Sequence, residues 1–283
     1  MGWVINLFLR VERRREDGFH DLASLFQVVS WGDDMAFQPL GSSAGRDELV
    51  CNVADIPTDS RNLAIKALDL FRRKTGSQER FRVWLDKRVP HGAGLGGGSG
   101  NAATALWAAN ELSGRPAGRE DLAAWAGEIG SDISVFFGSG ASYCLGLSTP
   151  AVFKALRLAS RSAVDPRQLL AELQKRRTVT QDICVNDLEQ PAFELLEELT
   201  EIRARMVESG AFSAVFMTGS GSTMVGVGSD ALPETLAHWR RDLFVAPARP
   251  LLRDPWGWYA RPHDSLLRAL LPRVEKPTGL GLF

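Results

Sequence analysis

The hydrophobic positions in the first third of the chain fall into short runs that predict β-strands. Polar or turn-forming segments, such as 16–18 and 41–48, separate these runs. One segment between them predicts a helix, because its apolar residues recur every three or four positions from Leu63 to Phe71 before Gly76 interrupts the pattern. The predicted strands are Val4–Val11, Leu25–Val29 and Phe81–Leu85.

Helical spacing becomes more frequent in the rest of the chain, beginning with an alanine- and leucine-rich stretch after Asn101. Further helices are predicted over Glu120–Ile129, 150–158, Pro166–Lys175 and 191–209, and further strands over 136–144, Ala214–Met217 and Met224–Val227. Together these elements predict an α+β fold. Beyond Gly146 the predicted elements are mostly helices. We therefore expect an N-terminal domain over 1–146, a C-terminal domain over 147–261 and a tail over 262–283.

The strongest chemical signal is a glycine-dense segment, PHGAGLGGGSGNAAT, over Pro90–Thr104. Glycines let backbone N–H groups approach an anion closely, and the N-terminus of the following helix adds further N–H groups and a positive dipole end. The hydroxyl of Ser99 can bind a phosphate oxygen or a magnesium ion. We therefore predict that Pro90–Ser99 is a phosphate loop. A flexible linker is the weaker alternative, because a linker would not run straight into a strong helix former.

The glycine spacing alone leaves the class of nucleotide site open. Gly92, Gly94 and Gly97 satisfy G-x-G-x-x-G, which keeps a nicotinamide-dependent oxidoreductase as a distant alternative. That class needs an acidic residue at the end of the next strand, and Glu111, at the required spacing, lies in a predicted helix. The sequence has no G-x-x-x-x-G-K-[ST] and no V-A-I-K, H-R-D or D-F-G set, which excludes Walker-type and protein-kinase sites.

The whole segment resembles the phosphate loop of the GHMP kinases, Pro-x-x-x-Gly-Leu-Gly followed by small residues. INLFLRV after Val4 and MTGSGST at Met217–Thr223 resemble two further motifs of that family. From Ile5 to Pro262 the chain is most similar to the plastid branch of plants and algae that acts on a cytidine-diphosphate-linked methylerythritol. The supporting segments are REDGFHDLASLFQ, RNLAIKAL, EIGSDI, STPAVFKAL and ICVNDLEQPAF.

The resemblance implies transfer of the γ-phosphate of ATP, with Mg²⁺, to the 2-hydroxyl of that substrate in the non-mevalonate isoprenoid pathway. It implies a left-handed βαβ crossover in the first domain, a ferredoxin-like second domain and an active site between them. Asp132 matches the catalytic aspartate; without the family, such an Asp is more often a cap or turn residue. The implied ATP-binding residues are Pro90, Gly92, Ala93, Gly94, Leu95, Gly96, Gly97, Gly98, Ser99, Asn62, Lys66, Gly219, Ser220 and Gly221, and the implied substrate-binding residues are Asn6, Phe19, His20, Thr149 and Phe153. No acidic cluster in the sequence identifies metal ligands.

Three features depart from the family pattern. Val4 stands where the family has a lysine that partners the catalytic aspartate. Leu147 follows Gly146 directly, where the family has a further loop and strand, so we expect the second domain to lack a strand. Gly100 and Ser134 stand where a serine and a proline are usual, and small effects are expected. These departures leave an alternative function, an impaired or inactive family member that still binds nucleotide.

Composition limits the partners and the location of the protein. The 283 residues include 33 Lys and Arg against 34 Asp and Glu, so no overall attraction to nucleic acid or an anionic membrane is expected. No apolar run approaches the roughly 18 residues of a membrane span, and no transit or signal peptide is visible. The three cysteines are sparse and predict reduced thiols. We expect a monomer or homodimer with a small-molecule substrate, plastidic by resemblance and otherwise cytoplasmic.

Overall fold

The computed structural model describes residues 2–16, 20–147, 161–229, 233–237, 239, 243–252 and 281–282. Its strands are β1 (Trp3–Arg14), β2 (His20–Val29), β3 (Asp34–Pro39), β4 (Glu48–Cys51), β5 (Phe81–Asp86), β6 (Ala141–Leu147), β7 (Ala214–Met217), β8 (Met224–Val227) and β9 (Gly281–Leu282). Its helices are α1 (Leu63–Thr75), α2 (Gly97–Leu112), α3 (Arg119–Ile129), the 3-10 helix η1 (Ile133–Phe137), α5 (Pro166–Arg176), α6 (Glu189–Leu195), α7 (Glu198–Glu208) and α8 (Glu234–Ala237). The α+β class is confirmed.

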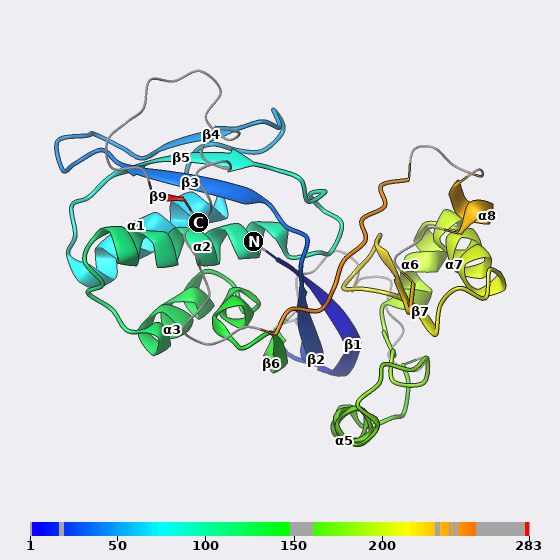
Figure 1. Cartoon of the computed structure of the whole chain (residues 1–283). Helices are drawn as coiled ribbons and strands as arrows, with labels where there is room; N and C mark the ends of the chain where they lie inside the picture. Colours follow the sequence, from blue (N-terminus) through cyan, green and yellow to red (C-terminus); the bar gives the residue numbers. More distant parts are fainter. Residues whose placement is uncertain are drawn as a thin grey trace.

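The described strands form three sheets. The first is antiparallel with the order β1-β2-β6, the second has the order β4-β5-β3-β9, and β7 pairs with β8 in the third. In Figure 1 the second sheet covers helices α1 and α2, and the first sheet lies below them near the middle of the molecule. Strand β7 and helices α5, α6, α7 and α8 lie at the opposite end from the second sheet. The two halves of the chain therefore meet along β1 and β2.

Helix α1 connects the parallel neighbours β4 and β5 in a βαβ crossover. Asn62 starts the helix, because its side-chain oxygen accepts the N–H of Ala64 at 2.9 Å. Gly76 ends it in the left-handed region, with φ at 74°. The helix predicted after Arg61 is therefore confirmed together with its stop. The left hand of the crossover, which the family resemblance implies, stays a prediction.

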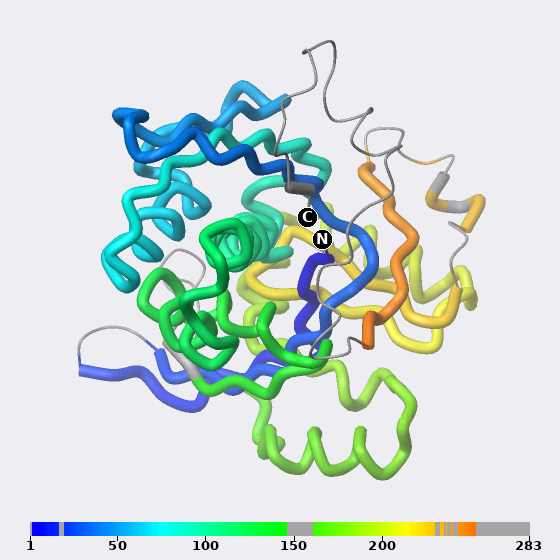
Figure 2. The backbone as a smooth tube through the Cα atoms, turned by 60° about the vertical axis from the view of Figure 1, so that its left-hand side comes forward, coloured from blue at the N-terminus to red at the C-terminus, as the bar shows by residue number. Residues whose placement is uncertain are grey.

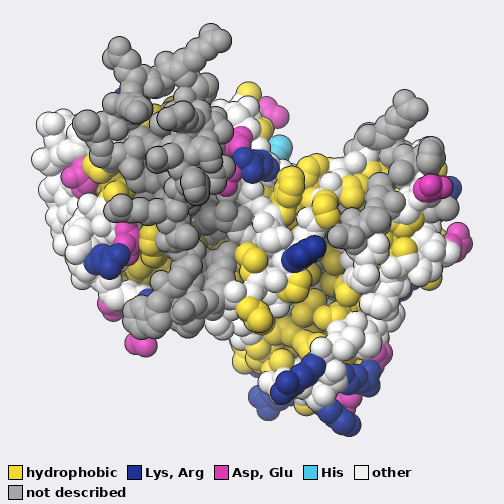
Figure 3. All heavy atoms as spheres, viewed as in Figure 1, with side chains coloured by type: hydrophobic (Ala, Val, Ile, Leu, Met, Phe, Trp, Pro, Cys, Tyr) yellow, Lys and Arg dark blue, Asp and Glu magenta, His cyan; other side chains and the backbone are white. Residues whose placement is uncertain are grey.

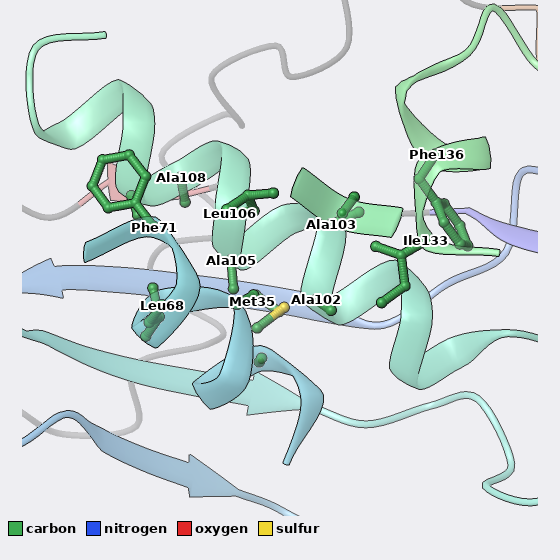
Figure 4. Close-up of a cluster of buried hydrophobic side chains, with 14 of the residues drawn as sticks. Met35, Leu68, Phe71, Ala102, Ala103, Ala105, Leu106, Ala108, Ile133 and Phe136 are labelled. Atoms are coloured by element: carbon green, nitrogen blue, oxygen red, sulfur yellow. The ribbon is translucent and has the colours of Figure 1, made fainter. Parts of the chain in front are cut away.

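The largest cluster of buried side chains surrounds helix α2. Alanines and other small residues let neighbouring elements approach this helix on nearly every side, so that most of its residues are buried. Leu68 and Phe71 of α1 and Met35 of β3 pack in the same cluster (Figure 4). Because the phosphate loop continues directly into α2, the core of the first half also fixes the position of that loop.

Removing a large side chain from this cluster tests its contribution to stability. The Phe71→Ala variant is expected to lower the free energy of unfolding by about 3–5 kcal/mol, because Phe71 is fully buried and its loss leaves a cavity. Urea denaturation followed by circular dichroism measures the change. Leu252→Ala is the control, since Leu252 is 91% exposed and its truncation is expected to cost less than about 0.5 kcal/mol. Equal losses in both variants would contradict this core.

The predicted strand over 136–144 is wrong at its start. Phe136 and Phe137 belong to the 3-10 helix η1, and β6 begins only at Ala141. Both rings are buried. The ring of Phe136 packs against α2 so closely that a Cβ added to Gly100 would lie 3.2 Å from it. Packing against the core therefore outweighs the strand preference of two adjacent aromatic residues.

The long helix predicted over 191–209 is also wrong, because the chain breaks there into α6 and α7. Leu196 has φ at −139° and ψ at 88°, which lies outside the helical region. The break leaves Leu195 66% exposed, whereas Leu199 and Met206 of α7 are buried as expected.

Strands β3 and β4 lie outside the predicted strands. The helix predicted over 150–158 and the amphipathic tail segment lie outside the described residues.

Residues 243–252 cross back from the second half of the chain and run beside β2 (Figure 2). Ser30 donates its backbone N–H to the carbonyl of Arg249, and Leu251 donates to the carbonyl of Val28, both at 2.8 Å. The ring of Phe244 lies 6.3 Å from that of Trp3 on β1. Figure 3 shows hydrophobic side chains gathered over the region where these halves meet, with Lys and Arg side chains at its lower rim.

Candidate active site

The phosphate loop forms one wall of a cavity of about 340 Å³. The lining combines apolar side chains, such as Ile56, Leu63 and Leu85, with the backbone of the glycine loop, so the cavity can take an apolar ring beside an anion. The lining residues are Ile56, Pro57, Arg61, Asn62, Leu63, Leu85, Lys87, Pro90, His91, Gly92, Ala93, Gly94, Leu95, Gly96, Gly97, Gly98, Ser99 and Asn101. The structure thus brings Asn62 and all the predicted residues of the phosphate loop together.

The conformation of the loop depends on its glycines. Gly92, Gly94 and Gly96 have φ values of 75°, 73° and 65°, a region that other residues rarely adopt. At Gly96, a Cβ would also lie 2.6 Å from Cγ2 of Val4, which is buried. Gly96 caps α2, so the helix begins at Gly97 inside the glycine run. The first N–H groups of α2, which have no partners within the helix, therefore lie at the cavity.

A buried ion pair between Lys87 and Asp33 holds the residues that lead into the phosphate loop. Lys87 donates from Nζ to Oδ2 of Asp33 at 2.8 Å and to the carbonyl of Val89 at 2.6 Å, and Asn101 of α2 donates to the same Asp33 oxygen at 3.0 Å. The other Asp33 oxygen accepts the N–H groups of Arg88 and Val89 at 2.8 Å. The sequence analysis did not predict this network. The charged run DKR before the phosphate loop is the sequence feature that could have indicated it.

Asp132 and Ser99 meet where the phosphate loop enters α2. Ser99 donates its hydroxyl to Oδ2 of Asp132 at 3.0 Å. Asp132 precedes η1 and is only half-buried, so its other oxygen can face a second group. Burial raises the pKa of the Cys144 thiol, and the negative charge of Asp132 nearby raises this pKa further. A partly exposed carboxylate beside the helix N-terminus can hold or accept a proton next to a bound phosphate.

The second glycine loop, Thr218–Thr223, packs against the phosphate loop rather than lining the cavity. A Cβ on Gly219 would lie 2.8 Å from the carbonyl oxygen of Gly94, and one on Gly94 would lie 2.9 Å from that of Gly221. Thr223 donates its hydroxyl to the carbonyl of Ala93 at 2.9 Å. Gly219, Ser220 and Gly221, predicted to bind ATP, are therefore in position to support the phosphate loop, and direct contact with ATP stays a prediction.

Asn6, predicted to contact the substrate, is buried between strands. Its backbone N–H donates to Oγ1 of Thr218 at 2.7 Å, and its side-chain amide donates to Oγ of Ser24 at 2.7 Å. Thr218 in turn donates to the side-chain oxygen of Asn6 at 3.2 Å. Asn6 thus joins β1, β2 and the second glycine loop, and a contact with substrate stays a prediction.

The other predicted residues lie apart from the cavity or outside the described chain. Lys66 is exposed on α1, four residues after Asn62, and does not line the cavity, so its role at the nucleotide stays a prediction. His20 is buried at the start of β2, opposite Arg14 of β1. The remaining predicted substrate residues, Phe19, Thr149 and Phe153, lie outside the described residues.

The pKa of His20 predicts a pH dependence. Burial, followed by the charge of Arg14, lowers the pKa of His20 below its ordinary value of 6.5. The unfolded chain then binds the proton more readily, so the stabilisation from neutral His20 is present above pH 6.5 and is lost as the pH falls toward the folded pKa. Urea unfolding from pH 5 to 8 is expected to show this loss, and His20→Gln should reduce it. A His20 midpoint at or above 6.5 by NMR titration would contradict this environment.

The comparisons with known proteins agree with this arrangement. The model of the GHMP kinases N terminal domain matches residues 62–149, and that of the GHMP kinases C terminal domain matches residues 152–243. A chloroplastic 4-diphosphocytidyl-2-C-methyl-D-erythritol kinase of Oryza sativa subsp. japonica is 47% identical over 92% of this chain and 72% of its own length. The chain belongs to the GHMP kinase family. The Arabidopsis thaliana protein of the same name is 46% identical, over 92% of this chain and 76% of its own length.

Solved structures also support the GHMP kinase fold. A crystal structure of 4-(cytidine 5'-diphospho)-2C-methyl-D-erythritol kinase is similar with a TM-score of 0.65 and 31% identity, over 80% of this chain and 88% of that one. A homoserine kinase from Cytophaga hutchinsonii, at 14% identity and a TM-score of 0.57, supports the fold alone. These relatives carry kinase names and do not indicate the inactive alternative. No helix in the described part of this GHMP kinase is long and apolar enough to cross a membrane.

Proposed function

We propose that this GHMP kinase transfers the γ-phosphate of ATP to the 2-hydroxyl of 4-diphosphocytidyl-2-C-methyl-D-erythritol, a step in isoprenoid precursor synthesis. Its relatives at 46–47% identity carry the name of this activity. The observation that supports it most is the phosphate loop along the cavity, whose last residue, Ser99, donates its hydroxyl to the carboxylate of Asp132. A phosphate-binding wall and a carboxylate that can activate a hydroxyl are the two parts that such a transfer needs.

The cavity can hold ATP because apolar side chains line one part of it and the backbone of the phosphate loop lines another. The adenine would lie between Ile56, Leu63 and Leu85, where apolar side chains cover a flat ring. The triphosphate would lie along Gly92–Ser99, where backbone N–H groups and the α2 dipole favour negative charge. The buried ion pair of Lys87 and Asp33 keeps the end of β5 in place beside this wall.

Asp132 acts on the substrate hydroxyl, and Ser99 holds Asp132. The carboxylate accepts the proton of the attacking hydroxyl, or orients that hydroxyl toward the γ-phosphorus. Because Ser99 donates to Oδ2, Oδ1 remains for the hydroxyl. The O–P bond to the substrate forms as the bond between the γ-phosphorus and the β,γ-bridging oxygen breaks, and ADP leaves with that electron pair.

The residues present fit a magnesium–nucleotide complex. Mg²⁺ prefers oxygen ligands and is usually held by nucleotide phosphates with one or two protein groups. Ser99 provides a hydroxyl oxygen at the phosphate loop, and it would hold the ion together with the nucleotide phosphates. When bound, the ion neutralises charge that develops on the phosphates.

The cytidine end of the substrate would be bound near His20, with Phe19 and Phe153 as the stacking rings that the resemblance implies. The lowered pKa of His20 keeps its imidazole neutral at pH 7, so that one ring nitrogen donates and the other accepts. A neutral imidazole can thus read both a carbonyl and an amino group of a base. We also propose a location in the plastid, which the chloroplastic names of the plant relatives support.

A coupled assay for ADP tests the proposed acceptor. Purified protein with Mg²⁺ and ATP is expected to form ADP when 4-diphosphocytidyl-2-C-methyl-D-erythritol is added. Homoserine and mevalonate are the comparison substrates, because related folds carry those names. Turnover with either of them but not with the cytidyl substrate would reject the proposed acceptor and retain the kinase.

A further inference from the structure

The segment Val185–Asp187 lies between the second glycine loop and β1 and has no part in the steps described above. It comes from the motif ICVNDLEQPAF. Leu9 of β1 donates its N–H to the carbonyl of Val185 at 2.8 Å, and Asp187 donates to the carbonyl of Leu9 at 3.0 Å. The segment therefore pairs with β1 through a single parallel bridge between Leu9 and Asn186.

Asp187 anchors this segment to β1. Its Oδ2 accepts Nε of Arg10 at 3.0 Å and the backbone N–H of Val11 at 2.7 Å, and its Oδ1 accepts the N–H of Ser162 at 3.0 Å. Both side chains of the Arg10–Asp187 pair are at least 95% buried. Arg10 also donates to the carbonyls of Ser162 and Val164. A buried carboxylate with this many donors holds its backbone in one position.

Asn186, the neighbouring residue, faces the second glycine loop. Its side-chain Nδ2 donates to the carbonyls of Met217 and Gly219, both at 2.8 Å, and its Oδ1 accepts the N–H of Leu188 at 2.9 Å. Both donors and the oxygen of the amide are thus directed at backbone groups. Gly219 in turn touches Gly94 of the phosphate loop with no room for a methyl group.

We propose that Asn186 is a positioning residue for phosphate transfer: its amide fixes the second glycine loop against the phosphate loop and so sets the place of the N–H groups that bind ATP. The support runs from β1 through Asp187 and Asn186 to Gly219 and then to Gly94. The support ends at the phosphate loop, whereas Asn6, the predicted substrate contact beside it, is also anchored to Ser24 of β2. Its loss therefore weakens ATP binding more than binding of the cytidyl substrate. This inference rests on the proposed function.

The Asn186→Asp variant removes the amide hydrogens and adds a negative charge at nearly the same shape. A carboxylate of the same shape keeps the acceptor for Leu188 and turns an oxygen toward the carbonyls of Met217 and Gly219. The expected result is a KM for ATP raised by about 10–100-fold, as for one to two lost hydrogen bonds, with the KM for the cytidyl substrate within about twofold. Gln190→Glu is the matched control, since Gln190 is exposed on α6 and its amide bonds only Glu194 in the described contacts.

Hydrogen exchange gives a second readout that does not depend on turnover. In Asn186→Asp, exchange is expected to rise in peptides over 217–223 and 92–96 and to stay unchanged in α1. Calorimetry with adenylyl imidodiphosphate is expected to show the same loss of affinity. If the wild type shows no turnover, the proposed function fails, and exchange and nucleotide affinity still decide the role of Asn186.

A wild-type KM for ATP in folded Asn186→Asp, or unchanged exchange over 92–96, would overturn the inference. If Asn186→Asp does not fold, Thr223→Val decides, because it removes a single hydrogen bond between the two loops. A several-fold higher KM for ATP in Thr223→Val, restored by Thr223→Ser, supports the role of the loop contact. An unchanged KM in Thr223→Val would overturn it.

Discussion

Asp132→Asn is expected to lower kcat by about 10²–10⁴-fold while leaving the dissociation constants of ATP and the cytidyl substrate nearly unchanged. An amide oxygen can still accept the hydroxyl of Ser99, which now lies 3.0 Å from Oδ2, so the local structure is retained. The amide cannot take the proton from the attacking hydroxyl. Steady-state kinetics and calorimetry on the same preparation separate the two effects.

Asp182→Asn is the matched control for Asp132→Asn. Asp182 is an exposed carboxylate that pairs with Arg176, whereas Asp132 is hydrogen-bonded to Ser99 of the phosphate loop. The same change of charge there is expected to leave kcat within about twofold, because exposed ion pairs contribute little. Retention of full turnover in Asp132→Asn would show that another group activates the hydroxyl.

Gly96→Ala is expected to lower kcat/KM for ATP by about 10²-fold. Two effects act together: φ at Gly96 is 65°, and the added Cβ would lie 2.6 Å from Cγ2 of the buried Val4. The start of α2 must then move, and a displacement of about 1 Å at binding groups is enough for a loss of this size. The KM for ATP and the affinity for adenylyl imidodiphosphate measure the effect.

Gly127→Ala is the control for Gly96→Ala. Gly127 lies within α3, and a Cβ there meets no atom within 4 Å. Alanine is a better helix former than glycine, so this variant is expected to keep its ATP affinity and to gain slightly in stability. Equal ATP affinity in both variants would contradict the placement of Gly96 at the nucleotide wall.

Patterns that depend on neighbouring residues predicted much of the fold. Strands Ala214–Met217 and Met224–Val227 have the bounds that the two short runs on either side of the loop TGSGST indicated. Helix α1 follows from its apolar face, Asn62 and Gly76. The glycine loop at the start of α2 also follows from local chemistry, because glycines and a helix former are adjacent in the sequence.

What sequence patterns did not predict depends on contacts between distant residues. Lys87 binds Asp33, 54 residues away, and Asn6 binds Thr218, 212 residues away. Neither pair has a spacing that marks it in the sequence. The break at Leu196 also falls among contacts between distant residues, because α6 and α7 share one hydrophobic cluster and α7 alone joins a second cluster with Val215 and Leu236.

Phosphorus-31 NMR of the reaction products tests the proposed function most directly. Wild-type protein with Mg²⁺, ATP and 4-diphosphocytidyl-2-C-methyl-D-erythritol is expected to give ADP and, in equal amount, a new phosphate monoester on the 2-hydroxyl, and Asp132→Asn is expected to give neither above background. ADP without the ester would indicate hydrolysis by water. No change in the wild-type spectrum, with the protein folded, would contradict a kinase that acts on this substrate.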